Sequence, residues 1–529
     1  MRKSQFRKRN SAEESKDEVG GHWITYRRIS QIVILILFSI LFLSSKYPLQ
    51  GQATVDQFFK VDPLIFLLVS LAARGWLWNL AWSVLLLALA VLLGRFFCGW
   101  VCPLGTSIDV TRRSLKRKEP VKNPSRKWMW LKYATLVFLA TSALLSLGLF
   151  WFFDPISIML RSMTLFLYPL FASAISYFLE TISLITALED PALDLLDWLK
   201  QSILPVYEQH LLKSLLVASI FLSIILIERY RSRFWCRYLC PLGALLGLVS
   251  KKSILQRKVS PACTDCGICQ RTCRMAAIAD DPVKTSSSEC IFCMDCSVVC
   301  PERAITYSFV LRGEREKSLD LSRRRIIASG LYGLVGVGLF GISAVDRAKA
   351  STAIRPPGAV PENEYLDRCV RCYTCIRACS TSGRCLQPSL TETGIEGLLT
   401  PAAVMRLGYC EYNCNLCGTV CPTGAIHEIS EEDKKKRKMG LAEFDRGRCI
   451  PWVSGENCIV CEEHCPVPEK AIKFESREVW VPGSGTKLVK IPFLVKDRCI
   501  GCGICETKCP VRGKAAIIVT REGEERWIE

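Results

Sequence analysis

The sequence predicts two kinds of structure in one chain: an α-helical membrane domain of four spans with a fifth linking span, and α+β domains organised around cysteines. Half of the 529 residues are apolar, and several runs reach the roughly 18 residues needed to cross a hydrocarbon core. The 29 cysteines occur mainly in Cys-x-x-Cys groups, which in a long chain indicate metal ligands rather than disulfides. The formal charge of +19 would suit nucleic acid, but anionic metal–thiolate centres would offset it. No nucleic-acid partner is therefore expected.

The charge between the apolar runs predicts how they cross the membrane. After a basic tail at residues 1–28, we expect spans at residues 29–45, 77–97, 134–153 and 211–227. Residues 103–132 carry nine Lys and Arg, whereas residues 154–210 carry two against seven acidic residues. The positive-inside rule then places the N-terminus, residues 103–132 and the region after 229 in the cytoplasm. Two shorter apolar runs, residues 62–73 and 163–179, are expected to be interfacial or re-entrant pieces on the outer side.

The membrane domain, residues 29–250, contains an internal repeat. One unit begins at Asp62-Pro63 and ends RFFCGWVCPLG, and the other begins at Asp154-Pro155 and ends RFWCRYLCPLG. Each unit is expected to be a hairpin whose second helix ends at the cytoplasmic face in Cys-x-x-x-Cys-Pro. Asp before Pro is most simply a helix N-cap, and a proton-handling carboxylate is the alternative.

The cysteines after Lys251 form six sets of four, with Cys385 left over as an expected unliganded thiol. Sets one and two lie in residues 251–311 and are Cys263, Cys266, Cys269 and Cys273, then Cys290, Cys293, Cys296 and Cys300. Sets three and four are Cys369, Cys372, Cys375 and Cys379, then Cys410, Cys414, Cys417 and Cys421. Sets five and six are Cys449, Cys458, Cys461 and Cys465, then Cys499, Cys502, Cys505 and Cys509.

The spacing Cys-x2-Cys-x2-Cys-x3-Cys is typical of [4Fe-4S] clusters. Three thiolates on one tight loop ligate one cluster, and the fourth turns away to ligate its neighbour. Cys300 is therefore expected to complete the first cluster and Cys273 the second. Structural zinc also uses four cysteines, but usually as pairs rather than as a triplet and a single residue. We therefore expect six [4Fe-4S] clusters in α+β bacterial ferredoxin-like domains, two in residues 251–311 and four in residues 351–529.

The repeat adds two cysteine pairs of another kind, Cys98 with Cys102 and Cys236 with Cys240. On a helix the Cβ atoms of such a pair lie roughly 5 to 6 Å apart, too far for a relaxed disulfide. Because both pairs end equivalent helices at one membrane face, they can meet as one four-thiol site. Its candidate contents are an iron–sulfur centre, a metal, or thiols that cycle through a disulfide, and cysteines that only pack are the alternative.

Residues 322–350 have the features of a twin-arginine export signal in the middle of the chain. Arg323 and Arg324 precede an apolar run at residues 326–345, and Ala348-Lys349-Ala350 follows as a candidate cleavage site. The run is the predicted fifth span, with its front end inside, so that residues 351–529 lie outside. The twin-arginine route moves folded cargo, which suits a domain whose clusters are inserted in the cytoplasm.

Two families resemble the two parts of the chain. The part up to residue 310, with RFFCGWVCPLG, RFWCRYLCPLG and two cluster sets, resembles the NapH-type membrane ferredoxin proteins. Residues 322–529, with SRRRII, IRPPGAVPENEYLDRCVRC and CIPWVSGENCIVCEEHCP, resemble the NapG/MauM ferredoxin-type proteins, which are exported by the twin-arginine route and carry four clusters. By analogy with four-cluster ferredoxin subunits, the resemblance implies that sets three and six share ligands, as do sets four and five.

The resemblance also implies a function. It is that of a multi-pass quinol dehydrogenase of the cytoplasmic membrane, with the two-cluster domain in the cytoplasm and the four-cluster domain in the periplasm. Electrons would come from the membrane quinone pool, or from a cytoplasmic donor, and go to a periplasmic cytochrome, molybdoenzyme or other reductase. The sequence has no Cys-x-x-Cys-His for attached haem and shows no flavin domain.

Two other functions remain as alternatives. Paired Cys-x-x-x-Cys-Pro motifs beside a two-cluster domain also resemble membrane proteins that reduce copper for oxidase assembly, so a redox maturation factor for a respiratory metalloenzyme is one of them. The other is a scaffold in which the clusters only hold small domains together. A four-cluster relay outside the membrane favours respiration, because metal reduction at the cytoplasmic face would not need it.

Overall fold

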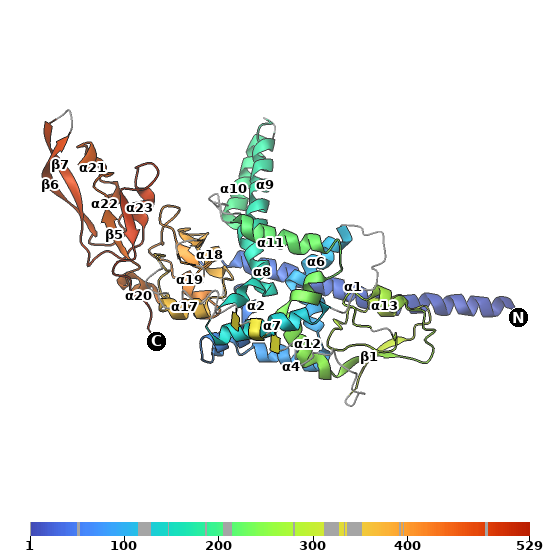
Figure 1. Ribbon diagram of the computed structural model, residues 1–529. Helices are drawn as coiled ribbons and strands as arrows, with labels where there is room; N and C mark the ends of the chain where they lie inside the picture. Colours follow the sequence, from blue (N-terminus) through green and yellow to red (C-terminus); the bar gives the residue numbers. More distant parts are fainter. Residues whose placement is uncertain are drawn as a thin grey trace. The chain divides into compact units, whose positions relative to one another are not determined.

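The computed structural model describes most of the chain, and its helices and strands are labelled in Figure 1. The described residues are 2–49, 53–114, 128–146, 148–185, 188–204, 214–278, 281–310, 352–390, 393–394, 396–481 and 485–528, with short helical pieces between 327 and 335. Arg323, Arg324, most of the predicted fifth span and Ala348-Lys349-Ala350 lie outside them. The fifth span therefore stays a prediction.

The chain divides into two compact units. The first comprises residues 1–40, 57–162 and 215–339, and the second comprises residues 41–56, 163–214 and 340–529. The second unit thus combines two segments of the predicted membrane domain with the predicted four-cluster domain.

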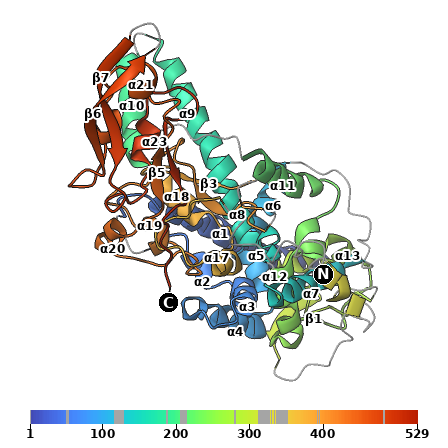
Figure 2. The ribbon, with the colours of Figure 1, turned by 60° about the vertical axis from the view of Figure 1, so that its left-hand side comes forward.

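In the described residues, the secondary structure of the apolar part consists of helices. Its longer helices are α1 (Arg2–Ser44), α3 (Pro63–Ala72), α4 (Ser83–Leu93), α6 (Pro103–Ser114), α7 (Leu131–Leu144), α9 (Tyr168–Ile182), α10 (Glu189–Ser202) and α11 (Ser214–Ile227). Shorter ones are α2 (Gln57–Lys60), α5 (Phe96–Trp100), α8 (Pro155–Ser162) and α12 (Pro241–Val249). Helices α9 and α10 pack side by side, as Figures 1 and 2 both show, around Leu179, Leu196 and Leu204.

Two helical stretches in the described part are long and apolar enough to cross a membrane, His22–Ser44 and Pro155–Ile182. The predicted spans at 77–97, 134–153 and 211–227 are the shorter apolar helices Trp78–Leu93, Leu131–Leu144 and Ser214–Ile227, so the four-span count stays a prediction. The second long stretch includes residues 163–179, for which the sequence predicted an interfacial piece. Arg161 interrupts that apolar run, but its guanidinium donates to the carbonyls of Trp151 (2.7 Å) and Ser157 (3.2 Å), so the helical stretch continues past it.

The two repeats begin in the same way, with an aspartate that caps a helix. Oδ1 of Asp62 accepts from the N–H of Leu64 at 2.8 Å, and Oδ2 of Asp154 accepts from the N–H of Ser157 at 2.6 Å. The N-cap interpretation of both residues is therefore confirmed. The two carboxyl groups are buried and interact with each other.

The cysteine-rich parts consist of short helices and two-stranded antiparallel sheets. In the first unit these are β1 (Leu255–Val259) with β2 (Ile305–Phe309), α13 (Ile268–Thr272) and α14 (Asp295–Val298). In the second unit the helices are α17 (Glu362–Arg368), α18 (Thr374–Cys379), α19 (Leu416–Thr419), α20 (Glu431–Lys436), α21 (Ile450–Val453), α22 (Val460–Glu463) and α23 (Ile504–Lys508). Its sheets pair β3 (Leu386–Pro388) with β4 (Pro401–Ala403), β5 (Leu441–Phe444) with β8 (Ile517–Thr520), and β6 (Ile472–Val481) with β7 (Gly485–Leu494).

One arginine joins three segments of the second unit. Arg377 on α18 is 1% exposed and donates to the carbonyl of Phe42 at 3.2 Å. Its guanidinium lies 4.6 Å from the ring centre of Phe42 and 4.4 Å from that of Tyr168. Nearby, the N–H of Tyr47 donates to Oγ1 of Thr381 at 2.8 Å. The cysteine-bearing part therefore packs directly on segments 41–56 and 163–214.

Candidate metal centres

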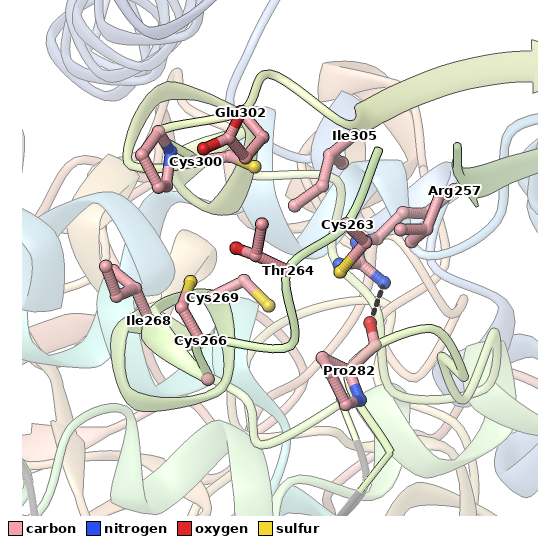
Figure 3. Close-up of a pocket in the computed structure, with 13 residues that line it drawn as sticks. Arg257, Cys263, Thr264, Cys266, Ile268, Cys269, Pro282, Cys300, Glu302 and Ile305 are labelled. Atoms are coloured by element: carbon pink, nitrogen blue, oxygen red, sulfur yellow. Dashed lines mark hydrogen bonds between the residues drawn. The ribbon is translucent and has the colours of Figure 1, made fainter. Parts of the chain in front are cut away.

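The first cysteine centre lies in the first unit between two loops. Cys263, Cys266 and Cys269, which lead into α13, line one pocket together with Cys300. Figure 3 shows the four sulfur atoms around a common space. This is the arrangement that the spacing predicts, in which the last cysteine of set two completes the first centre.

The second centre combines the last cysteine of set one with the first three cysteines of set two. Cys273 lies near Cys290, Cys293 and Cys296, and it packs in the same apolar cluster as Cys296. The Tyr307 hydroxyl is 3.1 Å from the Cys296 sulfur. The two centres thus exchange their fourth cysteine, because α13 and α14 pack against each other.

The second unit contains two more pairs of this kind. Cys421 joins Cys369, Cys372 and Cys375 around one pocket, and Cys465 joins Cys499, Cys502 and Cys505 around another. The remaining cysteines form two further groups. Cys379 lies near Cys410, Cys414 and Cys417. Cys509 lies near Cys449, and Cys449 groups with Cys458 and Cys461.

The structure therefore groups cysteines of set three with those of set four, and cysteines of set five with those of set six. The pairing implied by analogy, three with six and four with five, does not match this grouping. The physical reason is that α18 packs against α19, and α22 against α23, so the neighbours in space are also the neighbours in sequence.

The thiols fit iron–sulfur clusters better than single metal ions. Among the described residues, no three His, Cys, Asp or Glu side chains are close enough together to hold one metal ion. A cubane holds its four thiolates further apart than tetrahedral zinc does. Backbone N–H groups also point at the sulfurs of the exchanged cysteines: Ala277 donates to Cys273 at 3.3 Å, Ile426 to Cys421 at 3.4 Å and Ala516 to Cys509 at 3.4 Å.

The electrostatics of these thiols couple ligation to proton release. Burial first, and then the neighbouring thiols, raise the pKa of Cys372, Cys461 and Cys502 to about 12. Metal ligands must be thiolates, so cluster binding displaces these protons. The positive charge of the iron then stabilises the thiolate form, which the protein alone disfavours.

The centre formed by set four and Cys379 has two further neighbours. Cys385, expected to be unliganded, is 2% exposed, and its sulfur interacts with those of both Cys379 and Cys410. This contact lowers the pKa of Cys379 and Cys410. Lys434 is also buried, and its ammonium group adds to the lowering of the pKa of Cys410. Nothing in the spacing of the motif indicates either residue.

The structure also brings the two membrane-edge pairs together. Cys98, Cys102, Cys236 and Cys240 are all buried, and Cys240 lies near the other three. The N–H of Gly105 donates to the Cys102 sulfur at 3.4 Å, and the N–H of Gly243 donates to the Cys240 sulfur at 3.3 Å. The two repeats therefore present their second cysteine in the same way.

Comparison with known families and proteins agrees with these sites. A family described as a 4Fe-4S binding domain matches residues 75–122, 214–261 and 417–440, and a second family of the same description matches residues 492–512. The first two segments contain the two membrane-edge cysteine pairs. No solved structure matches the chain.

Three curated relatives show how the likeness is distributed. The methylamine utilization ferredoxin-type protein MauM of Methylorubrum extorquens is 36% identical over 207 residues, which are 37% of this chain and 88% of the relative. The ferredoxin-type protein NapG of Escherichia coli is 34% identical over 195 residues, 35% of this chain and 80% of the relative. The ferredoxin-type protein NapH of Haemophilus influenzae is 27% identical over 322 residues, 56% of this chain and 95% of the relative.

The cysteine centres and these relatives lead to one conclusion. The likeness to NapH, with the two long apolar helices, also fits association with a membrane. The chain is an iron–sulfur electron-transfer protein and belongs to the family of ferredoxin-type proteins that includes MauM and NapG.

Proposed function

We propose that this protein is a membrane-bound quinol dehydrogenase that passes electrons through six [4Fe-4S] clusters to a periplasmic cytochrome or reductase. The main observation behind this proposal is that, within each pair of sets, the two sets exchange their fourth cysteine. Exchange holds two clusters on either side of packed helices, which places them close enough for an electron to pass from one to the other.

The second unit offers a route from one pair to the next. The N–H of Cys410 donates to the carbonyl of Cys502 at 2.8 Å. Cys410 belongs to the centre of set four and Cys502 to the centre of set six, so a ligand of each is bonded to a ligand of the other. This bond supports the order three, four, six, five for the outer relay.

The entry to this relay is proposed at sets three and four. These sets adjoin the apolar segments through Arg377, which stacks on Phe42 and Tyr168, and through Tyr47, whose hydroxyl donates to the carbonyl of Asn413 at 3.0 Å. A quinol donor in the membrane would therefore meet the outer clusters at this end. Cluster five, at the far end of the order, would serve the acceptor.

The alternative is a maturation factor that reduces copper or another metal. Such a factor needs thiols that an arriving ion can reach. The four membrane-edge cysteines are each at most 8% exposed, and buried thiols are poorly placed to collect an ion from solution. Their burial favours electron transfer over metal uptake.

The test is anaerobic purification of the full chain, followed by iron and sulfide analysis and titration with reduced menaquinone and ubiquinone analogues. We expect at least about 24 irons per chain and cluster reduction by one quinol, seen as bleaching of the visible absorbance. Clusters that dithionite reduces but that neither quinol reduces would overturn the quinol dehydrogenase. Reduction of Cu(II) by the loaded protein at a rate above that of the quinol reaction would favour the maturation factor.

A further inference from the structure

Two arginines occupy the same place in the two repeats, at the start of RFFC and of RFWC. Arg95 and Arg233 are both 0% exposed. Arg233 donates to the carbonyls of Cys98 at 2.8 Å and of Gly105 at 3.4 Å, so it reaches from the second repeat to both ends of the first cysteine motif. Arg95 reaches the other way: a Cβ atom on Gly243 would lie 2.7 Å from its Nη2.

Gly243 therefore leaves room for the arginine of the opposite repeat, and Gly105 also lies beside the opposite arginine, since a Cβ atom there would be in ordinary contact with Nη1 of Arg233 at 3.6 Å. Cβ atoms at 2.7 Å do not occur, so a side chain at Gly243 would displace Arg95. The result is a pair of guanidinium groups on two sides of one four-thiol site, related by the same repeat that relates the thiols.

These guanidinium groups are only partly neutralised by carboxylates. Arg95 pairs with Glu289 at 2.9 Å, but Glu289 also binds Lys132. Arg233 pairs with Asp109 at 2.7 Å, but Asp109 also binds Arg274 at 3.0 Å. Arg274 also pairs with Asp295, and Glu228 accepts from the Arg233 N–H at 2.6 Å. Asp295 in turn pairs with Arg27 at 3.2 Å, so these five cations still outnumber the four carboxylates around them.

A further buried cation adds to this excess. Arg237, the residue after Cys236, is 0% exposed and donates to the carbonyl of Arg274. Neutral thiols or disulfides at the four cysteines would leave this charge uncompensated in a buried region, which is costly. Four thiolates around an iron–sulfur cubane carry a net charge of about −2 and would compensate it.

We propose that Cys98, Cys102, Cys236 and Cys240 hold a seventh iron–sulfur cluster, with Arg95 and Arg233 as its counter-charges. A single zinc or copper ion fits less well, because no three of the described His, Cys, Asp and Glu side chains are close enough together to hold one ion. The N–H groups of Gly105 and Gly243 would donate to one ligand sulfur in each repeat. The presence of this cluster does not depend on which molecule donates the electrons.

This cluster would exchange electrons with the second cluster of the same unit. The loop of set two lies on α5: Nε1 of Trp100 donates to the carbonyl of Phe292 at 2.9 Å, and a Cβ atom on Gly99 would lie 2.4 Å from the carbonyl oxygen of Ile291. One electron leaving either cluster oxidises it by one unit and reduces the other by one unit, with no proton transferred.

The first test is the iron content of the full-length protein, purified anaerobically, and of the double variant Cys102→Ser/Cys240→Ser. We expect the variant to lose about four irons per chain and one component of the electron paramagnetic resonance spectrum of the reduced protein, while the other six clusters remain. The control is Arg231→Gln, at an exposed arginine, which should lose no iron. Equal iron in the variant and the parent, or zinc or copper bound in the parent and lost in the variant, would overturn the proposal.

The second test distinguishes arginines that act on a cluster from arginines that only stabilise the fold. Arg233→Lys keeps the positive charge but loses the several hydrogen bonds of the guanidinium group. Arg95→Gln removes the positive charge. We expect Arg95→Gln to shift the midpoint potential of the seventh cluster downward and to leave the potentials of the four outer clusters unchanged. The matched control is Arg231→Gln, at an exposed arginine. No shift in Arg95→Gln, or an equal shift in all clusters, would contradict the role of Arg95. Loss of quinol-driven reduction with the seventh cluster intact would count against the proposed function alone.

Discussion

The sulfur of Cys385 lies 3.9 Å from that of Cys379, and Cys379 belongs to the centre formed by Cys410, Cys414 and Cys417. Cys385 also interacts with Cys410, so one buried thiol contacts two ligands of one cluster. A thiol that donates to ligand sulfurs stabilises the more negative, reduced state of the cluster. Cys385 is therefore placed to raise the potential of this centre without ligating it.

Replacing Cys385 with Ala should lower the midpoint potential of this one cluster. Cys385→Ser keeps a donor and should shift it less. Both variants should retain the iron content of the parent, measured together with a redox titration followed by electron paramagnetic resonance. Loss of about four irons in Cys385→Ala would instead make Cys385 a ligand.

The ligand exchange between sets three and four predicts which cluster each cysteine serves. Cys421→Ser should perturb the same spectral component as Cys372→Ser, because both residues line one pocket. Cys417→Ser should perturb a different component, although it lies in the same motif as Cys421. If Cys421→Ser and Cys417→Ser altered one and the same component, the exchange would be refuted.

A buried ion pair predicts acid sensitivity of the second unit. Burial alone would raise the pKa of Glu362, but hydrogen bonds and charge from Arg355, with Arg526, hold it below its usual range. The contribution to stability is therefore present above the ordinary glutamate pKa and is lost as the pH falls through the lowered value. Glu362→Gln should destabilise the unit by about 3–5 kcal/mol, since Arg355 stays buried without its partner.

Thermal unfolding of the loaded protein at neutral and at acidic pH measures this effect. Glu364→Gln on the same helix is the control, because the pair of Glu364 with Arg368 is exposed on the glutamate side and should contribute less than about 1 kcal/mol. Equal destabilisation by both substitutions at neutral pH would show that the buried pair has no special role.

The contacts of Arg377 predict that one substitution loosens the segments around it. Arg377→Ala removes two ring contacts and the hydrogen bond to the Phe42 carbonyl, at a cost of about 2 kcal/mol or more. Hydrogen exchange should increase at residues 41–49 and on α18. Lys435→Ala removes a half-buried cation from the ring of Tyr412 and should change little. Unchanged exchange in Arg377→Ala would mean that the segments are held by other contacts.

Substitutions at Asp62 and Asp154 distinguish a helix-capping role of these residues from a proton-transfer role. Asn caps helices as well as Asp does, so Asp62→Asn and Asp154→Asn should each retain stability and quinol-driven reduction, whereas Asp62→Leu should cost about 1–2 kcal/mol in thermal unfolding. Loss of quinol-driven reduction in the stable Asn variants would assign proton transfer to the pair.

The cluster sets could be predicted from the sequence because the ligand spacing is local. In sets one, two, three and six, three cysteines within seven residues fix their own loop, whatever surrounds it. The pairing among the last four sets depends on which helices pack together, as α18 and α19 do, and no local pattern contains that information. Arg95 and Arg233 could have been noticed, since RFFC and RFWC align, but their burial beside the thiols is a tertiary property.

The second unit is built from three separate stretches of the chain, and the contacts of Arg377 join all three. Residues 352–528 are therefore held against residues 41–56 and 163–214 by packing, and not only by the continuity of the peptide chain. Cutting the chain after Ala350 would not by itself separate residues 352–528 from the rest of this unit.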